Sequence, residues 1–253
     1  MVEHVDNPAG RLRKLLLDLH THNHTEQMQQ QKPAWTAILE LAEVEGSLDR
    51  EMTAISTVVG LPTKVRQAVQ ALPVDDDRKE HLLDHLDEVE RGMVHVLTRQ
   101  SLNTVFTAFA PGGVVPQSAA ISSLSHCSYE LHRHAPEPTV SDEDLARIIE
   151  MINDLMLEVA RADLPDAIRG AMVNHLMALL QAAYNVRFAG TQPLDDALFA
   201  LMGAASRANA EEGLARVGLW GKFKNAVQTI GTMLSTGQSA AQLGQGIAGF
   251  LGG

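Results

Sequence analysis

The sequence predicts an all-α protein, built as a multi-helix bundle, on three observations. Apolar residues recur at spacings of three and four, as at Ile38, Leu41 and Ala42, which is the pattern of a helix with one buried face. Alternating apolar and polar stretches bounded by turn residues, which indicate β-strands, are nearly absent. Helix-start signals precede several of the apolar segments. Together these features favour helices throughout the chain.

The helix-start signals and the breaks place the elements in order. Pro33 suits a first helical turn, and Asp77 with Glu80 and Ser141 with Asp144 have capping-box spacing. The clearest breaks are APGG at 110–113 and HAPEPT at 134–139. We therefore expect helices over residues 9–22, 33–58, 63–71, 77–99, 102–110, 117–132, 142–162, 166–187, 194–211, 218–235 and 239–250.

A divergent internal repeat is the second organising feature. Leu72-Pro73 is followed by His85-Leu86, and Leu164-Pro165 is followed by His175-Leu176 in a similar setting. The two copies recur at a period of about 90 residues. Recurrence at a fixed period is typical of duplicated helical modules. The predicted organisation is a first helical repeat over 1–113, a second over 114–216 and a C-terminal tail over 217–253.

Composition excludes several function classes. The chain has 20 Lys+Arg against 31 Asp+Glu, a formal charge of −11, whereas nucleic-acid binding rests on a surplus of basic residues. Cys127 is the single cysteine, so an internal disulfide framework is excluded. The N-terminal apolar stretch is too short for a secretory signal, and no run of about 20 apolar residues occurs. We expect a cytoplasmic protein without a cofactor and without nucleic acid as partner.

The N-terminal histidines are the sharpest enzymatic candidate. His20, His22 and His24 follow the apolar Leu15–Leu17. The pattern resembles the opening strand of PHP-type metal-dependent phosphoesterases, in which histidines two residues apart on a strand face one metal. That resemblance implies a metal-dependent hydrolase with further ligands on later strands. The following segments predict helices and not the later strands that would supply further ligands. Read as a helix, the segment places its leucines on one apolar stripe and the histidines at its polar end, so the sequence favours no metal here.

Other candidate sites have simpler structural interpretations. His81 and His85 lie four apart and would share one face of a helix, but only His85 has a counterpart in the second repeat. This favours a packing or capping role for His85. His126 projects about 100° away from Cys127 on a helix, which predicts a small buried cysteine rather than a reactive thiol. Ser239, in Gly237-Gln238-Ser239, is interpreted as a helix N-cap.

The tail is the most informative segment. All 31 acidic residues lie before residue 217, and the only charges after it are Lys222 and Lys224. Leu219, Phe223 and Ile230 recur at helical spacing and predict an amphipathic helix. A second apolar, glycine-rich segment follows. The predicted contact residues for a membrane or a sister subunit are Leu219, Trp220, Lys222, Phe223, Lys224, Ile230, Leu243, Ile247 and Phe250.

Three functional hypotheses follow. The leading one is a non-enzymatic protein that acts by association, with the tail engaging a membrane or sister subunits, as in a membrane-perturbing effector of bacterial defence or conflict. Deleting 217–253 would then abolish lipid binding and leave the bundle folded. The alternative is a soluble helical adaptor or regulator, with a protein partner, whose tail is docked in the core; the same deletion would then unfold part of it. The third is the metal-dependent hydrolase.

Overall fold

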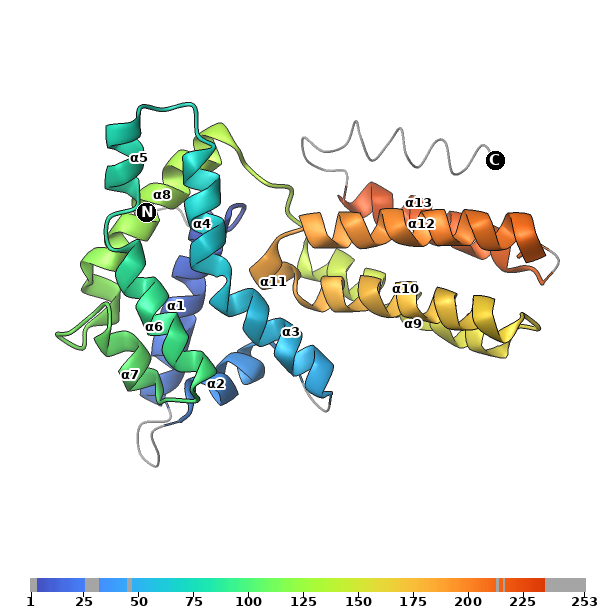
Figure 1. Ribbon diagram of the computed structural model, residues 1–253, viewed down its shortest axis with the longest axis horizontal. Helices are drawn as coiled ribbons and strands as arrows, with labels where there is room; N and C mark the ends of the chain where they lie inside the picture. Colours follow the sequence, from blue (N-terminus) through green and yellow to red (C-terminus); the bar gives the residue numbers. More distant parts are fainter. Residues whose placement is uncertain (1–3, 26–31, 45–46, 213, 216, 235–253) are drawn as a thin grey trace. The chain divides into compact units, whose positions relative to one another are not determined.

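The computed structural model describes residues 4–25, 32–44, 47–212, 214–215 and 217–234. Over these residues the secondary structure is helical and contains no sheet, which confirms the predicted all-α class (Figure 1). The helices, in chain order, are α1 (Pro8–Thr25), α2 (Ala34–Leu41), α3 (Leu48–Val59), α4 (Leu61–Gln70), α5 (Asp76–Leu82), α6 (Leu86–Leu97), α7 (Leu102–Thr107), the 3-10 turn η1 (Val115–Gln117), α8 (Ala119–His134), α9 (Asp142–Arg161), α10 (Asp166–Tyr184), α11 (Val186–Ala189), α12 (Gln192–Glu212) and α13 (Leu219–Leu234).

The chain divides into two compact units. Unit 1 comprises residues 1–136 together with Arg187–Ala189, and unit 2 comprises the remainder, 137–186 and 190–253. Arg187–Ala189, the last three residues of α11, belong to unit 1 because they bond to its α1: Arg11 Nε donates to the Phe188 carbonyl at 3.1 Å. The boundary predicted after residue 113 falls inside unit 1, and the one predicted after residue 216 falls inside unit 2.

Unit 1 is organised around α1. This helix packs against α2, α4, α7 and α8, and its apolar stripe of Leu12, Leu16 and Leu19 is fully buried. The three leucines recur at spacings of four and three, so they share one face of the helix. The sequence pattern thus places α1 at the centre of this unit.

Unit 2 is a four-helix bundle. Each of α9, α10, α12 and α13 packs against two others, in the closed order α9, α10, α12, α13 and back to α9. Figure 1 shows these helices running side by side. At the start of α9 the Ser141 hydroxyl accepts a hydrogen bond from the Asp144 backbone N–H at 3.0 Å, as the capping-box spacing predicts. The helix α13 therefore closes the bundle.

Two predicted helices are each broken near their middle, and a third, 166–187, is interrupted near its end at Asn185, between α10 and α11. The segment 33–58 forms α2 and α3, separated by a turn in which Glu43 has a left-handed backbone (φ 52°). The segment 77–99 forms α5 and α6, with His85 left-handed (φ 66°) between them, and Asp75, not Asp77, caps α5. Non-glycine residues rarely adopt this conformation, so the sequence does not signal the break at His85. The first break does have a signal, Gly46-Ser47, because Ser47 occupies the N-cap position of α3.

The aligned positions of the sequence repeat have different local structures. His85 occupies the left-handed turn before α6, whereas His175 lies in the middle of the continuous helix α10. The two His-Leu pairs are thus not equivalent in backbone conformation. Among the described residues, no helix is both long enough and apolar enough to cross a bilayer.

Candidate functional site

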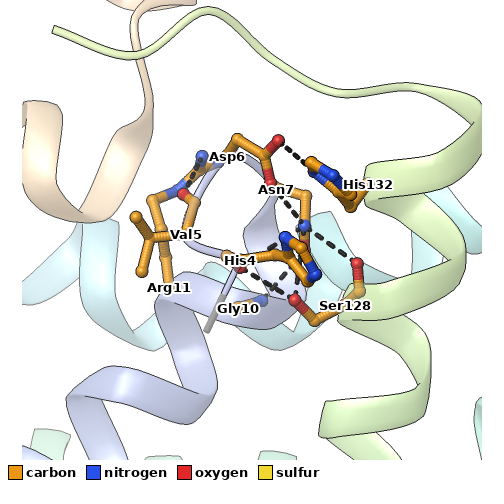
Figure 2. Close-up of polar contacts among 8 residues, drawn as sticks. All are labelled: His4, Val5, Asp6, Asn7, Gly10, Arg11, Ser128 and His132. Atoms are coloured by element: carbon orange, nitrogen blue, oxygen red, sulfur yellow. Dashed lines mark hydrogen bonds and ion pairs between the residues drawn. The ribbon is translucent and has the colours of Figure 1, made fainter. Parts of the chain in front are cut away.

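A polar cluster in unit 1 joins the segment before α1 to the helix α8 (Figure 2). Asn7, which is 1% exposed, accepts a hydrogen bond at Oδ1 from the Gly10 backbone N–H at 2.9 Å and so caps α1. Its Nδ2 donates to the Ser128 carbonyl at 3.1 Å and lies 3.3 Å from the Ser128 hydroxyl. A single buried amide therefore completes one helix and binds another.

Gly10 allows the chain to approach this closely. The Ser128 hydroxyl donates to the His4 carbonyl at 2.8 Å, directly over the first turn of α1. A Cβ atom on Gly10 would lie 1.6 Å from that carbonyl oxygen and 2.8 Å from Ser128 Oγ. Any side chain at position 10 would displace the backbone of residue 4, because its Cβ would overlap sterically with the His4 carbonyl oxygen.

Three metal-ligating side chains meet at the outer edge of the cluster. Asp6 accepts at Oδ1 from the Asn7 amide at 3.1 Å, and its Oδ2 lies 2.5 Å from Nδ1 of His132. The rings of His4 and His132 stack with centroids 3.8 Å apart and planes inclined by 20°. Ligand atoms of the three residues all lie within 4.8 Å of one another. Their residue types and spacing are compatible with a transition-metal ion.

A pocket of about 490 Å³ adjoins this edge, because His4 and Ser128 also line it. Arg78 from α5 forms an ion pair with Glu130 of α8, whose side chain is 9% exposed and whose second oxygen lies 3.6 Å from His134. A buried carboxylate requires such partners. The other lining residues are Gly10, Arg13, His81, Ser125, His126 and Tyr129, so the walls are rich in guanidinium and imidazole groups.

Cys127 lies in sequence between two pocket-lining residues, His126 and Ser128, but is itself buried. Its thiol, 1% exposed, donates to the Leu82 carbonyl at 2.6 Å, and burial raises its pKa to about 12. The thiolate is the nucleophilic form of cysteine, so the structure confirms a buried structural residue. The groups that the site offers are imidazole, carboxylate and guanidinium.

The N-terminal histidines do not form the strand that the phosphoesterase resemblance implies. Helix α1 continues to Thr25, so His20 and His22 project about 200° apart. The His20 ring packs edge-on against Phe106 at 5.9 Å, and Nε2 of His22 lies 2.9 Å from Glu40. The side chain of His24 lies outside the described residues. The metal site that the resemblance implies requires a strand, and this segment is a helix.

Glu40 gives His22 a structural role. Lys32 Nζ lies 2.5 Å from the same Glu40 oxygen, and this hydrogen bond, together with that of His22, holds the pKa of the Glu40 carboxyl below its usual value. These contacts join His22 of α1 to Glu40 of α2 and to Lys32, which precedes α2. They account for His22 without a metal ion.

His81 and His85 do not share a helix face. The break at His85 separates them, and each bonds to its own acidic neighbour: His81 to Asp84 at 3.0 Å and His85 to Glu88 at 3.2 Å. The prediction of one continuous helix here is wrong for the reason given above. His81 instead lines the pocket.

The predicted contact residues of the tail lie on two sides of α13. Leu219, Phe223 and Ile230 are buried in the core of unit 2, at 4%, 0% and 1% exposed. Lys222 and Lys224 lie toward solvent: Lys222 pairs with Glu158 of α9 at 2.5 Å, and Lys224 Nζ lies 5.0 Å from the centroid of the Trp220 ring. Leu243, Ile247 and Phe250 lie outside the described residues.

Sequence reasoning did not find the group formed by His4, Asp6 and His132. The two N-terminal residues precede the first helix, and His132 lies 126 residues after Asp6. No local motif connects them; the only available signal is His-x-Asp next to an Asn helix cap. Ser128 and His132 do show the spacing of four that places both on one face of α8.

Comparison with protein families, with curated proteins and with solved structures finds no match to this chain.

Proposed function

We propose that the protein acts by association and has no catalytic role of its own: a helical adaptor in which α13 completes unit 2 and the following residues, 235–253, contact a membrane surface or a sister copy. The observation that carries this proposal is the burial of the apolar face of α13. Leu219, Phe223, Val227, Ile230 and Leu234 are each at most 4% exposed. Side chains used in this way are not available for a partner while α13 stays docked.

The outward face of α13 also supports assigning the contact with a membrane or sister copy to residues 235–253 and not to α13. Lys222, Asn225, Gln228, Thr229 and Thr232 are exposed, and none of them is apolar. An interfacial membrane helix needs an accessible apolar face. The residues that could supply one come later in the sequence, because 225–253 contains no charged residue and ends in a segment with Leu243, Ile247 and Phe250.

Two truncations separate the roles of α13 and of the residues after it. Protein ending at residue 234 keeps the four-helix bundle and should unfold cooperatively like the full chain. Protein ending at residue 216 loses α13 and exposes the core of unit 2, so we expect loss of cooperative thermal unfolding. Circular dichroism during heating measures both. This expectation replaces the simpler one that residues 217–253 can be removed without harm.

Vesicle flotation then tests the association itself. Full-length protein should float with vesicles of phosphatidylcholine and phosphatidylglycerol, or form a larger species in their absence, and protein ending at 234 should do neither. Ile247→Ser with Phe250→Ser should reduce the effect at full length, and Gln242→Ser, in the same segment, is the matched control. The proposal is contradicted if the protein ending at 234 binds vesicles or self-associates as strongly as the full chain.

A second candidate function is a membrane-perturbing effector that inserts α13 itself. It is favoured by Trp220 and Lys224, both half-buried on α13, which form a cation–π pair and are residue types common at membrane interfaces. This function requires α13 to leave the bundle. Hydrogen exchange distinguishes the two: α13 amides stay protected with vesicles if it remains docked, and lose protection if it inserts.

A further inference from the structure

We propose that His4, Asp6 and His132 bind one divalent transition-metal ion of the Zn²⁺ class. Two ligands come from the segment before α1 and the third from α8, so the ion would join the N-terminal segment to the helix that carries Ser128 (Figure 2). This site lies in unit 1 and is independent of the function proposed for residues 235–253. It is also distinct from the N-terminal histidines His20 and His22.

The donor set fits the metal. Imidazole nitrogen and carboxylate oxygen are Zn²⁺ ligands at about 2.0–2.2 Å, which puts two ligands of a tetrahedral site about 3.3 Å apart. Asp6 Oδ2 and His132 Nδ1 are 2.5 Å apart, and the three ligand atoms lie within 4.8 Å. Shifts on the order of 1 Å, within the reach of side-chain rotation, bring them to coordinating positions.

The contact between Asp6 and His132 marks the position of the ion. A hydrogen bond there requires a proton on Nδ1 of His132, because an ionised carboxylate only accepts. Zn²⁺ would take the place of that proton between the two groups, and the proton passes to Nε2 or to solvent. The stacked rings of His4 and His132 must tilt apart, and the His132 side chain is 42% exposed, so space for this is present.

The backbone around the ligands is already fixed. The Asn7 amide holds Asp6 Oδ1, which leaves Oδ2 directed at His132, and the Ser128 hydroxyl holds the His4 carbonyl. Asn7 and Ser128 are themselves 1% and 4% exposed. Outer contacts that orient ligands in this way are a regular part of metal sites. These contacts orient the segment that carries both N-terminal ligands.

Three protein ligands leave a fourth position for water or an anion. His4 lines the adjoining pocket, whose walls also carry the guanidinium groups of Arg13 and of Arg78, the latter paired with Glu130. A guanidinium group next to an open coordination position favours an anionic fourth ligand. We therefore expect the ion to bind more tightly with inorganic phosphate or carbonate present than in their absence.

The test is calorimetric titration of ZnCl₂ into full-length protein without a polyhistidine tag, followed by Co²⁺ absorption spectroscopy. The proposal predicts one equivalent bound, and a Co²⁺ spectrum of the intensity that four-coordinate sites give. His132→Ala and Asp6→Asn should each weaken binding by about 100-fold or more, since even outer contacts are worth about 10- to 100-fold. Asp6→Asn retains the size and a hydrogen-bonding group, and circular dichroism verifies its folding.

The controls are histidines outside the group. His175→Ala, in α10 of unit 2, and the double change His20→Ala with His22→Ala, in α1, should leave the tight equivalent unchanged. The proposal is overturned if no ion binds, if Asp6→Asn and His132→Ala bind as tightly as the unmodified chain, or if the His20 and His22 change removes the bound equivalent.

Discussion

The two units are each closed by a terminal segment, but the chemistry of closure differs. In unit 1 residues 4–7 are held on α8 by buried hydrogen bonds from Asn7 and Ser128. In unit 2 α13 is held on α9 and α12 by apolar side chains, among them Phe223 and Ile230. Hydrogen bonds depend on angle and distance, whereas apolar burial scales with area. Polar closure therefore specifies one geometry, and apolar closure provides most of the stability.

This contrast also separates the two proposals. Fixed geometry is what three metal ligands need, and it is found in unit 1. A helix that fills a core gives a firm attachment point for the residues after it, and that is found in unit 2. Breaking each closure in turn should have effects that differ in size and in kind.

The largest effect is expected from the apolar closure. Phe223→Ala removes a fully buried ring from the unit 2 core and should lower the free energy of unfolding by about 3–5 kcal/mol. Lys222→Ala, at the preceding residue and on the exposed face, removes one surface ion pair and should lower the free energy of unfolding by about 0–1 kcal/mol. Urea denaturation of both variants measures the difference. Equal effects would mean that α13 is not docked.

A smaller effect is expected where the polar closure depends on close approach. Gly10→Ala places a Cβ against the His4 carbonyl, so residues 4–6 must move and lose their hydrogen bonds to α8, at about 2–3 kcal/mol. The matched control is Gly170→Ala in α10, where a Cβ meets nothing within 4 Å. It should stabilise by about 0.5–1 kcal/mol. Loss of stability in both variants would contradict a specific role for Gly10.

Removing one hydrogen-bonding group should cost less than displacing the segment. Ser128→Ala loses the hydroxyl that donates to the His4 carbonyl and should lower stability by about 1 kcal/mol. The same change should weaken Zn²⁺ binding by about 10-fold through His4. Ser122→Ala, on an exposed part of α8, is the control and should alter neither quantity. Titration and urea denaturation of the same samples provide the two readings.

The last effect concerns one charge in unit 2, is similar in size to that of Ser128→Ala and depends on pH. Burial, with the neighbouring charge of Asp196, raises the pKa of Asp195 to about 6. Because this pKa is higher in the fold than in the unfolded chain, the stability linked to it is present below about pH 4 and is lost as the pH rises through about 6. Asp195→Asn should therefore stabilise by about 1 kcal/mol at about pH 7, discounted for partial solvent exposure, and by almost nothing at about pH 4. A gain that is equal at both pH values would exclude the charge as its cause.

Periodicity predicts much of this fold. The apolar stripe of α1 and the buried face of α13 can be seen in the printed sequence, because a spacing of three and four is itself the physical requirement for one buried face. The break at His85 cannot be, since it relies on a left-handed non-glycine residue. The break between α2 and α3 does have a signal in Gly46-Ser47, which the expected helix over 33–58 ignores.

The candidate metal group shows a different limit. His4 and Asp6 meet His132 only after α1 and α8 have packed, and no spacing in the chain encodes that meeting. The obvious local motif, His20 with His22, instead became part of a helix and an ion pair. The role of Gly10 could not be predicted from the sequence either, because it comes from the His4 carbonyl group, which lies against Gly10 only in the folded chain.

Vesicle flotation of the full chain and of the protein ending at residue 234, at low and high salt, tests the central claim most directly. The account predicts that only the full chain floats, or forms a larger species without vesicles, and that salt changes this little, because residues 235–253 contain no charged side chain. Flotation of both proteins, abolished by salt, would instead assign binding to Lys222 and Lys224 of an undocked α13 and would contradict the account.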